Sequence, residues 1–249
     1  MSATAVTAHP QATRRIGLAM AATGAILFSA KAILAKFQYR YGVDSLDVLA
    51  LRMLLSLPLF VALGIRETRR PGHARMSRRD FGLIVILGVL GYYLSSLFDF
   101  WGLEYVPVSL ERLILFLNPT FVLLIGVFAF KRKVARREWV ALAVSYAGVT
   151  LVFVENLRVQ GEHILLGSGL VLLAALSYAL YLSMSGELLK RIGSLRLVAY
   201  AMTISTAATL THYLIARDPS HLLAFPAPVY GLAAINAFFK ASAGSIFGF

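Results

Sequence analysis

The sequence has no cysteine, and only 14% of its 249 residues are charged. The chain therefore has neither disulfide bonds nor thiolate metal ligands. Soluble domains carry about 25% charged residues, so a water-soluble fold of this composition would have too little polar surface to cover its apolar side chains. The composition excludes an ordinary soluble protein.

Two motifs of energy-driven or catalytic proteins are also missing. The sequence contains neither a "GxxxxGK[ST]" phosphate-binding loop nor an "HExxH" zinc motif. The first would be needed by an ATP-driven pump of the usual kind and the second by a common class of intramembrane protease. We therefore expect a protein that is not an enzyme, with no catalytic residue, cofactor or metal site.

Long apolar runs dominate what is present. Hydrophobic residues make up 59% of the chain and the mean hydropathy is +0.75. Because about 20 apolar residues span a bilayer as a helix, the runs predict an all-α integral membrane protein with seven spans and the start of an eighth. The predicted spans are Ile16–Phe37, Val48–Ile65, Phe81–Phe100, Leu110–Phe130, Trp139–Val154, Ile164–Met184, Leu197–Ala216 and the run from Val229 onward.

The net charge of +12 lies in short basic clusters between these runs. One set of alternate loops and flanks holds sixteen Lys and Arg residues, and the other set holds four. Since cytoplasmic loops carry the excess of basic residues, we predict a multi-pass protein of the cytoplasmic (inner) membrane with a cytoplasmic N-terminus. Residues 1–15 would form a disordered cytoplasmic tail. The basic clusters are read as topology signals and not as a nucleic-acid site.

A weak internal repeat relates the two halves of the chain. The stretch "LFSAKAILAKFQYRYGVDSLDVLALRM" can be laid on "ALSYALYLSMSGELLKRIGSLRLVAYAM", which places Ser29 on Ser177 and Gly42 on Gly193. Five predicted spans separate the two copies, so the second copy would be inverted in the membrane. Inverted repeats of this kind are typical of secondary transporters.

Three stretches, "FSAKAILAK…YGVDSLDVLALRMLLSLPLF", "VSLERLILFLNPTFVLLIGVFAF" and "EWVALAVSYAGVTLVF", resemble the EamA-type drug/metabolite transporter superfamily. The resemblance covers about residues 16–239. It implies ten helices in two inverted five-helix repeats, a central cavity and alternating access. Residues 16–154 would form a complete first repeat and residues 162–249 an incomplete second one.

The chain departs from the family pattern at two places. Family members commonly carry an acidic residue just past the fourth span, where this sequence has Lys131 and Arg132. The final "KASAGSIFGF" is not expected to continue the eighth helix beyond about Phe239. A truncated or frame-shifted copy is therefore expected.

Lys31 lies in the middle of the first predicted span. A central lysine costs about 3 kcal/mol on insertion and each Leu, Ile or Phe returns about 0.3–0.6, so the span inserts whether or not Lys31 has a role. Three interpretations stay open: a contact to solute, a structural counter-ion, or snorkelling to the headgroups. Helical side chains lean towards the N-terminus of the helix, which disfavours outward snorkelling.

Further polar residues fall within the spans. Arg52 is either an anchor or ion-pair partner near the outer interface, or a cavity residue. Asp99 either carries protons or pairs with Lys31 or Arg52, and it ends a polar line that begins with Tyr92 and Ser95. The second copy has Ala179 in the place of Lys31.

The fourth span contributes three more candidates. Glu111 and Arg112 are adjacent and point about 100° apart, so one is expected to line the cavity and the other to meet the outer interface. The Asn118–Pro119 pair breaks the helix, which either lines a cavity or only kinks the packing. The candidate substrate-binding residues are therefore Lys31, Arg52, Tyr92, Ser95, Asp99, Glu111, Arg112 and Asn118.

The expected function is secondary transport of a small metabolite or amino-acid-like solute by alternating access. Two cations in the first half, Lys31 and Arg52, favour an anionic solute. The expected partners are the lipid bilayer and the solute, with protons as the candidate coupling ion and a homodimer left open. The alternative is a truncated remnant of such a transporter that no longer transports.

Overall fold

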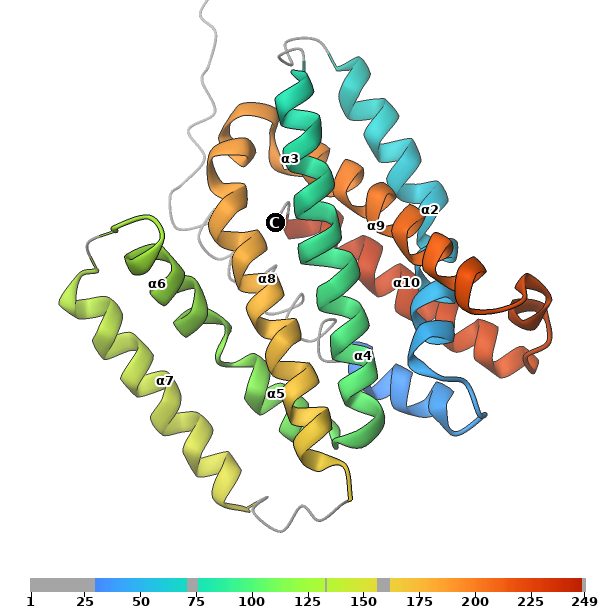
Figure 1. The fold of residues 1–249 in the computed structure, drawn as a ribbon, viewed down its shortest axis with the longest axis horizontal. Helices are drawn as coiled ribbons and strands as arrows, with labels where there is room; N and C mark the ends of the chain where they lie inside the picture. Colours follow the sequence, from blue (N-terminus) through green and yellow to red (C-terminus); the bar gives the residue numbers. More distant parts are fainter. Residues whose placement is uncertain (1–29, 71–75, 133, 156–161, 248–249) are drawn as a thin grey trace, which may run out of the picture.

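The computed structural model describes residues 30–70, 76–132, 134–155 and 162–247, and within these ranges it is helical with no strand (Figure 1). Residues 30–39 form the first helical segment. The elements that follow are α2 (Ser45–Arg69), α3 (Arg78–Gly88), η1 (Val89–Leu94), α4 (Ser95–Tyr105), α5 (Val108–Leu115), α6 (Asn118–Phe128), α7 (Arg136–Glu155), α8 (Ile164–Ile192), α9 (Ser194–Ala216), η2 (Pro219–Leu223) and α10 (Ala227–Phe247).

Capping boxes fix the starts of α2 and α3. The Asp44 side chain accepts from the backbone N–H of Asp47, whose own side chain accepts from the Asp44 N–H. Ser77 and Asp80 make the same reciprocal bonds at the start of α3. Each box satisfies backbone donors that the first turn of a helix leaves without partners, and the acidic residue lies at the positive end of the helix dipole.

The third predicted span changes its helical winding halfway. The chain runs from α3 through the π-helical turn η1 into α4 without a break. A π-helical turn widens the helix by one residue and is often found at functional sites. Tyr92 lies in this turn and Asp99 follows in α4, so the spacing between them differs from that of a regular α-helix.

The fourth predicted span is broken, as the Asn118–Pro119 pair predicts. α5 ends at Leu115, and α6 starts at Asn118 with the proline in its first turn. Proline fits the first turn because the N–H that it lacks would have no helical partner there. The break therefore separates the short segment that carries Glu111 and Arg112 from the apolar remainder of the span.

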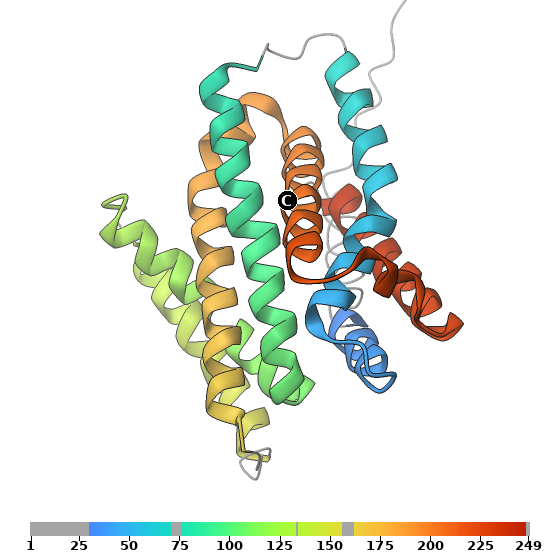
Figure 2. The same ribbon diagram turned by 45° about the vertical axis from the view of Figure 1, so that its right-hand side comes forward.

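Two helix pairs form the centre of the molecule. α4 packs along α8 and α2 packs along α9, with α10 against α2 (Figures 1 and 2). The α4–α8 pair is close because glycines face each other: a Cβ on Gly102 would lie 2.7 Å from the carbonyl oxygen of Gly167. α5 and α6 pack on the other side of α8, and α7 lies beyond them.

Four stretches of the described residues are long and apolar enough to cross a membrane, namely Ser45–Arg69, Arg78–Tyr105, Val108–Phe128 and Ile164–Ile192. Together with the helical fold, they make the chain an all-α membrane protein. α7, α9 and α10 lie on the other predicted spans, and their crossing stays a prediction. The first predicted span falls mainly outside the described residues. One expectation is wrong: α10 does not end near Phe239 but continues to Phe247.

Candidate solute-binding site

Lys31 and Asp99 meet in the interior of the helical bundle. The Lys31 ammonium, from the helical residues 30–39, donates to Oδ2 of Asp99 on α4, and the two side chains are only 13% and 5% exposed. The neighbouring residues Ala32 and Ala35 are fully buried. The lysine therefore points into the bundle and does not snorkel to the headgroups. Of the three interpretations from the sequence, the structure favours that of a counter-ion, here to Asp99.

Arg52 lies beside this pair. Its side chain is 1% exposed and its guanidinium lies 4.6 Å from the centre of the Phe100 ring, which the Lys31 ammonium also approaches at 5.3 Å. Within the described part of the chain, Nε and Nη2 of Arg52 have no hydrogen-bond partner. Arg52 is thus an interior residue and not an anchor at the membrane surface.

Lys240 joins the site from α10, which the sequence reasoning missed. Its ammonium lies 4.7 Å from the centre of the Tyr92 ring, close enough to Arg52, Lys31 and Asp99 to interact with each of them electrostatically. Lys240 thus adds a residue of the second half to a cluster whose other members lie in the first half.

A count of the basic residues along the sequence would have identified Lys240 as a candidate. Of the 24 Lys and Arg residues, twenty lie in loops or flanks, and the remaining four are Lys31, Arg52, Arg112 and Lys240.

Glu111 and Arg112 lie close to Asp99. Glu111 is fully buried, and its carboxyl group lies within hydrogen-bonding reach of the Asp99 carboxyl group. Arg112 turns back, so that its Nε lies 3.1 Å from Oε2 of Glu111 while its side chain keeps 18% exposure. Glu111 thus takes the interior position and Arg112 a half-buried one beside it.

The other three predicted site residues are Tyr92, Ser95 and Asn118. The Tyr92 ring faces Lys240, and its hydroxyl lies 3.0 Å from the hydroxyl of Tyr181 on α8. Ser95 is half-buried at the start of α4, one turn before Asp99. Asn118 starts α6, and its Oδ1 is buried without a donor among the described residues.

We call Lys31, Arg52, Arg112, Lys240, Asp99 and Glu111 the buried charge cluster. It holds four cations and two carboxyl groups, so even with both carboxyls ionised it has an excess of two positive charges. Burying an ion costs several kcal/mol unless an opposite charge compensates it. The cluster can therefore bind an anion. Among the described residues, no group of three or more His, Cys, Asp or Glu is placed to hold a metal ion.

A second polar network joins α2 and α9 at one end. Arg217 bonds to Asp44 and, at 2.8 Å, to Oδ2 of Asp47, while the Tyr213 hydroxyl donates to Oδ1 of Asp47 at 2.9 Å. Partial burial works against the charge of Arg217, but the two carboxylates raise its pKa above the ordinary value. We call Asp44, Asp47, Tyr213 and Arg217 the α2–α9 clasp.

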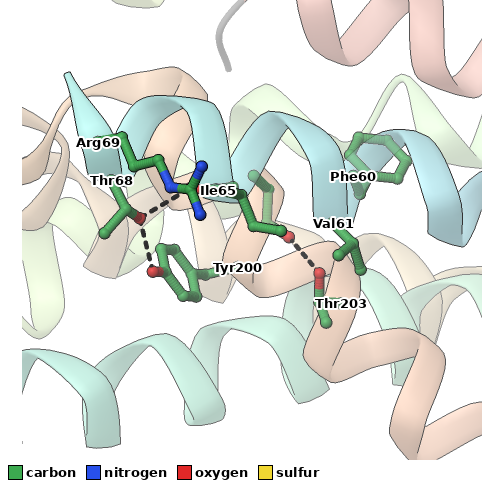
Figure 3. Close-up of a pocket in the computed structure, with 9 residues that line it drawn as sticks. Phe60, Val61, Ile65, Thr68, Arg69, Tyr200 and Thr203 are labelled. Carbon is green, nitrogen blue, oxygen red and sulfur yellow. Dashed lines mark hydrogen bonds between the residues drawn. The ribbon is translucent and has the colours of Figure 1, made fainter.

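At the opposite end, the same two helices line a cavity of about 360 Å³ (Figure 3). The Thr68 hydroxyl donates to the Gly64 carbonyl at 2.7 Å and lies 2.8 Å from the Tyr200 hydroxyl, and Arg69 lies at the rim. The lining residues are Phe60, Val61, Gly64, Ile65, Thr68, Arg69, Ala199, Tyr200 and Thr203. The α2–α9 contact therefore holds an ion-pair network at one end and, at the other, a cavity beside the Thr68–Tyr200 hydrogen bond.

Comparisons with known proteins agree with this picture. The profile of the EamA-like transporter family matches residues 15–154. The uncharacterized transporter YcbK of Bacillus subtilis (strain 168) is 31% identical over 223 residues, which are 86% of this chain and 69% of that protein. The uncharacterized transporter YyaM of the same organism is 24% identical over 174 residues, covering 67% of this chain and 55% of that protein.

A protein of known crystal structure superposes with a TM-score of 0.61 at 16% identity, covering 90% of this chain and 77% of the other. At that identity the superposition supports the fold alone. The family profile covers more than half of the chain, and YcbK is matched over more than two thirds of its length. The chain therefore belongs to the EamA-like transporter family.

Proposed function

We propose that this protein is a secondary transporter that moves a small anionic metabolite through the cytoplasmic membrane by alternating access. The observation that carries the proposal is the excess of buried cations in the charge cluster. Arg52 supports it most directly, because two nitrogens of its guanidinium are buried without a hydrogen-bond partner in the described ranges. A guanidinium in this state is suited to a carboxylate or phosphate group, which it can bind through two parallel hydrogen bonds.

The surroundings of Arg52 favour a solute that is small and partly apolar. Phe100 lies under the guanidinium, and Tyr92, Tyr178 and Tyr181 stand together across from α10, with ring centres 5.0 Å apart for Tyr92 and Tyr181. Aromatic rings of this kind bury apolar surface while the hydroxyl groups stay available for hydrogen bonds. Amino-acid-like and other carboxylate solutes carry both features.

The asymmetry of the α2–α9 contact supports alternating access. The two repeat-related stretches end in the first turns of α2 and α9. In an inverted repeat, the two ends of the α2–α9 contact would exchange environments when the transporter changes state. Here the end with Asp47 and Arg217 is clasped and the end with Thr68 and Tyr200 encloses a cavity. With the orientation that the basic loops predict, the cavity opens towards the cytoplasm and the clasp closes the outer side.

Counterflow in reconstituted vesicles tests the proposal. Vesicles loaded with unlabelled lactate, succinate, glutamate or inorganic phosphate are diluted into the labelled form of the same anion, with choline and glucose as cationic and neutral controls. We expect transient accumulation of at least one anion and of neither control. Arg52→Met should abolish it, whereas Lys36→Met, on the same helical segment as Lys31 but outside the cluster, should not. Counterflow of choline or glucose alone, or of no compound, would contradict the proposal.

A further inference from the structure

Three carboxyl oxygens in the buried charge cluster lack a hydrogen-bond donor in the part of the chain that the structure describes. They are Oδ1 of Asp99 and both Oε1 and Oε2 of Glu111, which are buried without a hydrogen-bond partner among the described residues. Buried polar atoms are nearly always hydrogen-bonded, and each exception requires a physical reason. Three such oxygens on two neighbouring carboxyl groups point to a shared cause.

The charged groups around the two carboxyls do not supply the missing hydrogen bonds. Lys31 is bonded to the other oxygen of Asp99, and Arg112 Nε lies 3.1 Å from Glu111 Oε2 without the alignment of a hydrogen bond. Arg52 and Lys240 approach from α2 and α10 and interact with Asp99 through space. The hydroxyl of Tyr39, a further titratable group near Asp99, donates to the Phe100 carbonyl at 2.7 Å.

One proton accounts for two of these three oxygens. Ionised carboxylates are acceptors only. Two of them within hydrogen-bonding reach therefore repel each other, and neither can donate to the facing oxygen of the other. When one carboxyl is protonated, its O–H donates to the other, and the pair shares a single negative charge. The four surrounding cations then face one negative charge instead of two.

We propose that Asp99 and Glu111 form a proton-binding site whose proton is bound together with the anionic solute, so that the transporter carries both in the same direction. This inference rests on the proposed function. Protonation makes the buried charge cluster more positive and therefore strengthens the binding of an anion at Arg52 and Lys240. Linkage is reciprocal, so bound anion also holds the proton.

The sign of the coupling separates this proposal from proton exchange. In an exchange mechanism the proton and the anion would compete for one site, and acid would weaken anion binding. Here the proton occupies carboxyl oxygens and the anion occupies cationic groups, so acid strengthens binding. Couplings between sites commonly change affinity about 5–150-fold.

Infrared spectroscopy of the purified protein in lipid bilayers tests the proton site without any solute. We expect a C=O stretching band of a buried protonated carboxyl near neutral pH, shifted by exchange into D₂O. The band should disappear in Glu111→Gln, which keeps the size of the side chain. It should remain in Glu104→Gln, because Glu104 binds the Ser45 N–H outside the cluster. Identical spectra of wild type and Glu111→Gln would overturn the proposal.

Vesicle transport tests the coupling. An inwardly directed acid gradient should increase accumulation of the anion that shows counterflow. Glu111→Gln should lose this response to the gradient, whereas Glu104→Gln, outside the cluster, should keep both counterflow and the response. Counterflow in the wild type without a response to the gradient, or accumulation driven by the opposite gradient, would overturn the coupling and leave the proposed function standing. Failure of counterflow with every anion would overturn the proposed function itself, and the coupling with it, even where the infrared band is present.

Discussion

Two buried cations of the charge cluster differ in what their removal leaves behind. Lys31 is paired with Asp99, whereas the Nε and Nη2 atoms of Arg52 have no hydrogen-bond partner in the described ranges. Removing one member of a buried ion pair leaves the charge of the other buried without compensation, which commonly costs about 3–5 kcal/mol of stability. Removing Arg52, whose hydrogen bonds within the described ranges are incomplete, instead removes its own desolvation cost. The two substitutions should therefore act on stability in different ways.

Lys31→Met should lower the unfolding temperature of the purified protein clearly, because Asp99 is left buried beside no bonded cation. The double substitution Lys31→Met with Asp99→Asn should recover most of the loss, since both charges are then gone. Scanning fluorimetry in detergent, read as a double-mutant cycle, measures the coupling. Additive losses from the two single substitutions would show that the ion pair contributes nothing to stability.

Arg52→Met should leave the unfolding temperature unchanged or raise it. The lost contact with the Phe100 ring is worth about 0.5–2 kcal/mol, while the desolvation of a buried cation costs several kcal/mol. Transport of the anion should nevertheless fall at least about tenfold, which corresponds to about 1.4 kcal/mol of binding energy. A fall in unfolding temperature as large as that of Lys31→Met would indicate that Arg52 has a structural role instead.

Of the individual residues in the buried charge cluster, the sequence predicted some but not all. Lys31, Arg52, Asp99 and Glu111 stand out because each is a charged residue in an apolar run. Lys240 was missed because "KASAGSIFGF" is rich in small residues and was not expected to be helical. Which of Glu111 and Arg112 lies in the interior was left open by the sequence, because a long arginine side chain reaches back over its neighbour in a way that helical spacing does not fix.

Among the elements, the close pairing of α4 with α8 depends on glycine. Gly102→Ala would place a methyl group 2.6 Å from Val171 Cγ2 and 2.7 Å from the Gly167 carbonyl oxygen. Backbone cannot move aside as a side chain can, so the two helices must separate. We expect a loss of about 1–3 kcal/mol, as for overpacked cores, seen as a lower unfolding temperature.

Gly82→Ala is the matched control for this prediction. Gly82 lies in α3 with open space where its Cβ would be, and alanine favours a helix over glycine by about 1 kcal/mol. Its unfolding temperature should stay the same or rise. Equal effects of the two substitutions would show that the α4–α8 approach does not limit stability.

The irregular elements show what a sequence pattern can and cannot predict. The break between α5 and α6 was predictable because proline lacks an N–H and cannot continue the preceding turn. The π-helical turn η1 was not, because nothing in "VLGYYL" forbids an α-helix. It depends instead on tertiary packing: Gly91 lies so close to Tyr181 on α8 that a Cβ would fall 2.3 Å from the tyrosine ring.

For the whole molecule, the proposed alternating access takes the clasp and the cavity as features of one of two states. The clasp connects the two repeat-related helices at the end where Arg217 meets Asp44 and Asp47, and the cavity opens at the other end around Thr203. Because the sequence contains no cysteine, a single introduced cysteine reports on each end without background labelling.

Thr203→Cys should react with a membrane-impermeant maleimide from the cytoplasmic side, whereas Thr209→Cys, fully buried towards the clasped end, should be protected. Adding Arg217→Gln removes both ion pairs of the clasp. Arg217 is one third exposed, so the loss is about 1 kcal/mol, which shifts the balance between states about fivefold. Labelling at Thr203→Cys should therefore slow, and labelling at Thr209→Cys from the outer side should begin.

Asp218→Asn is the control, because Asp218 is next to Arg217 but outside the clasp. It should change neither labelling rate. Faster labelling at both positions would mean that Arg217→Gln loosens the fold and does not favour a second state, and labelling of Thr203→Cys from the outer side would reverse the proposed orientation.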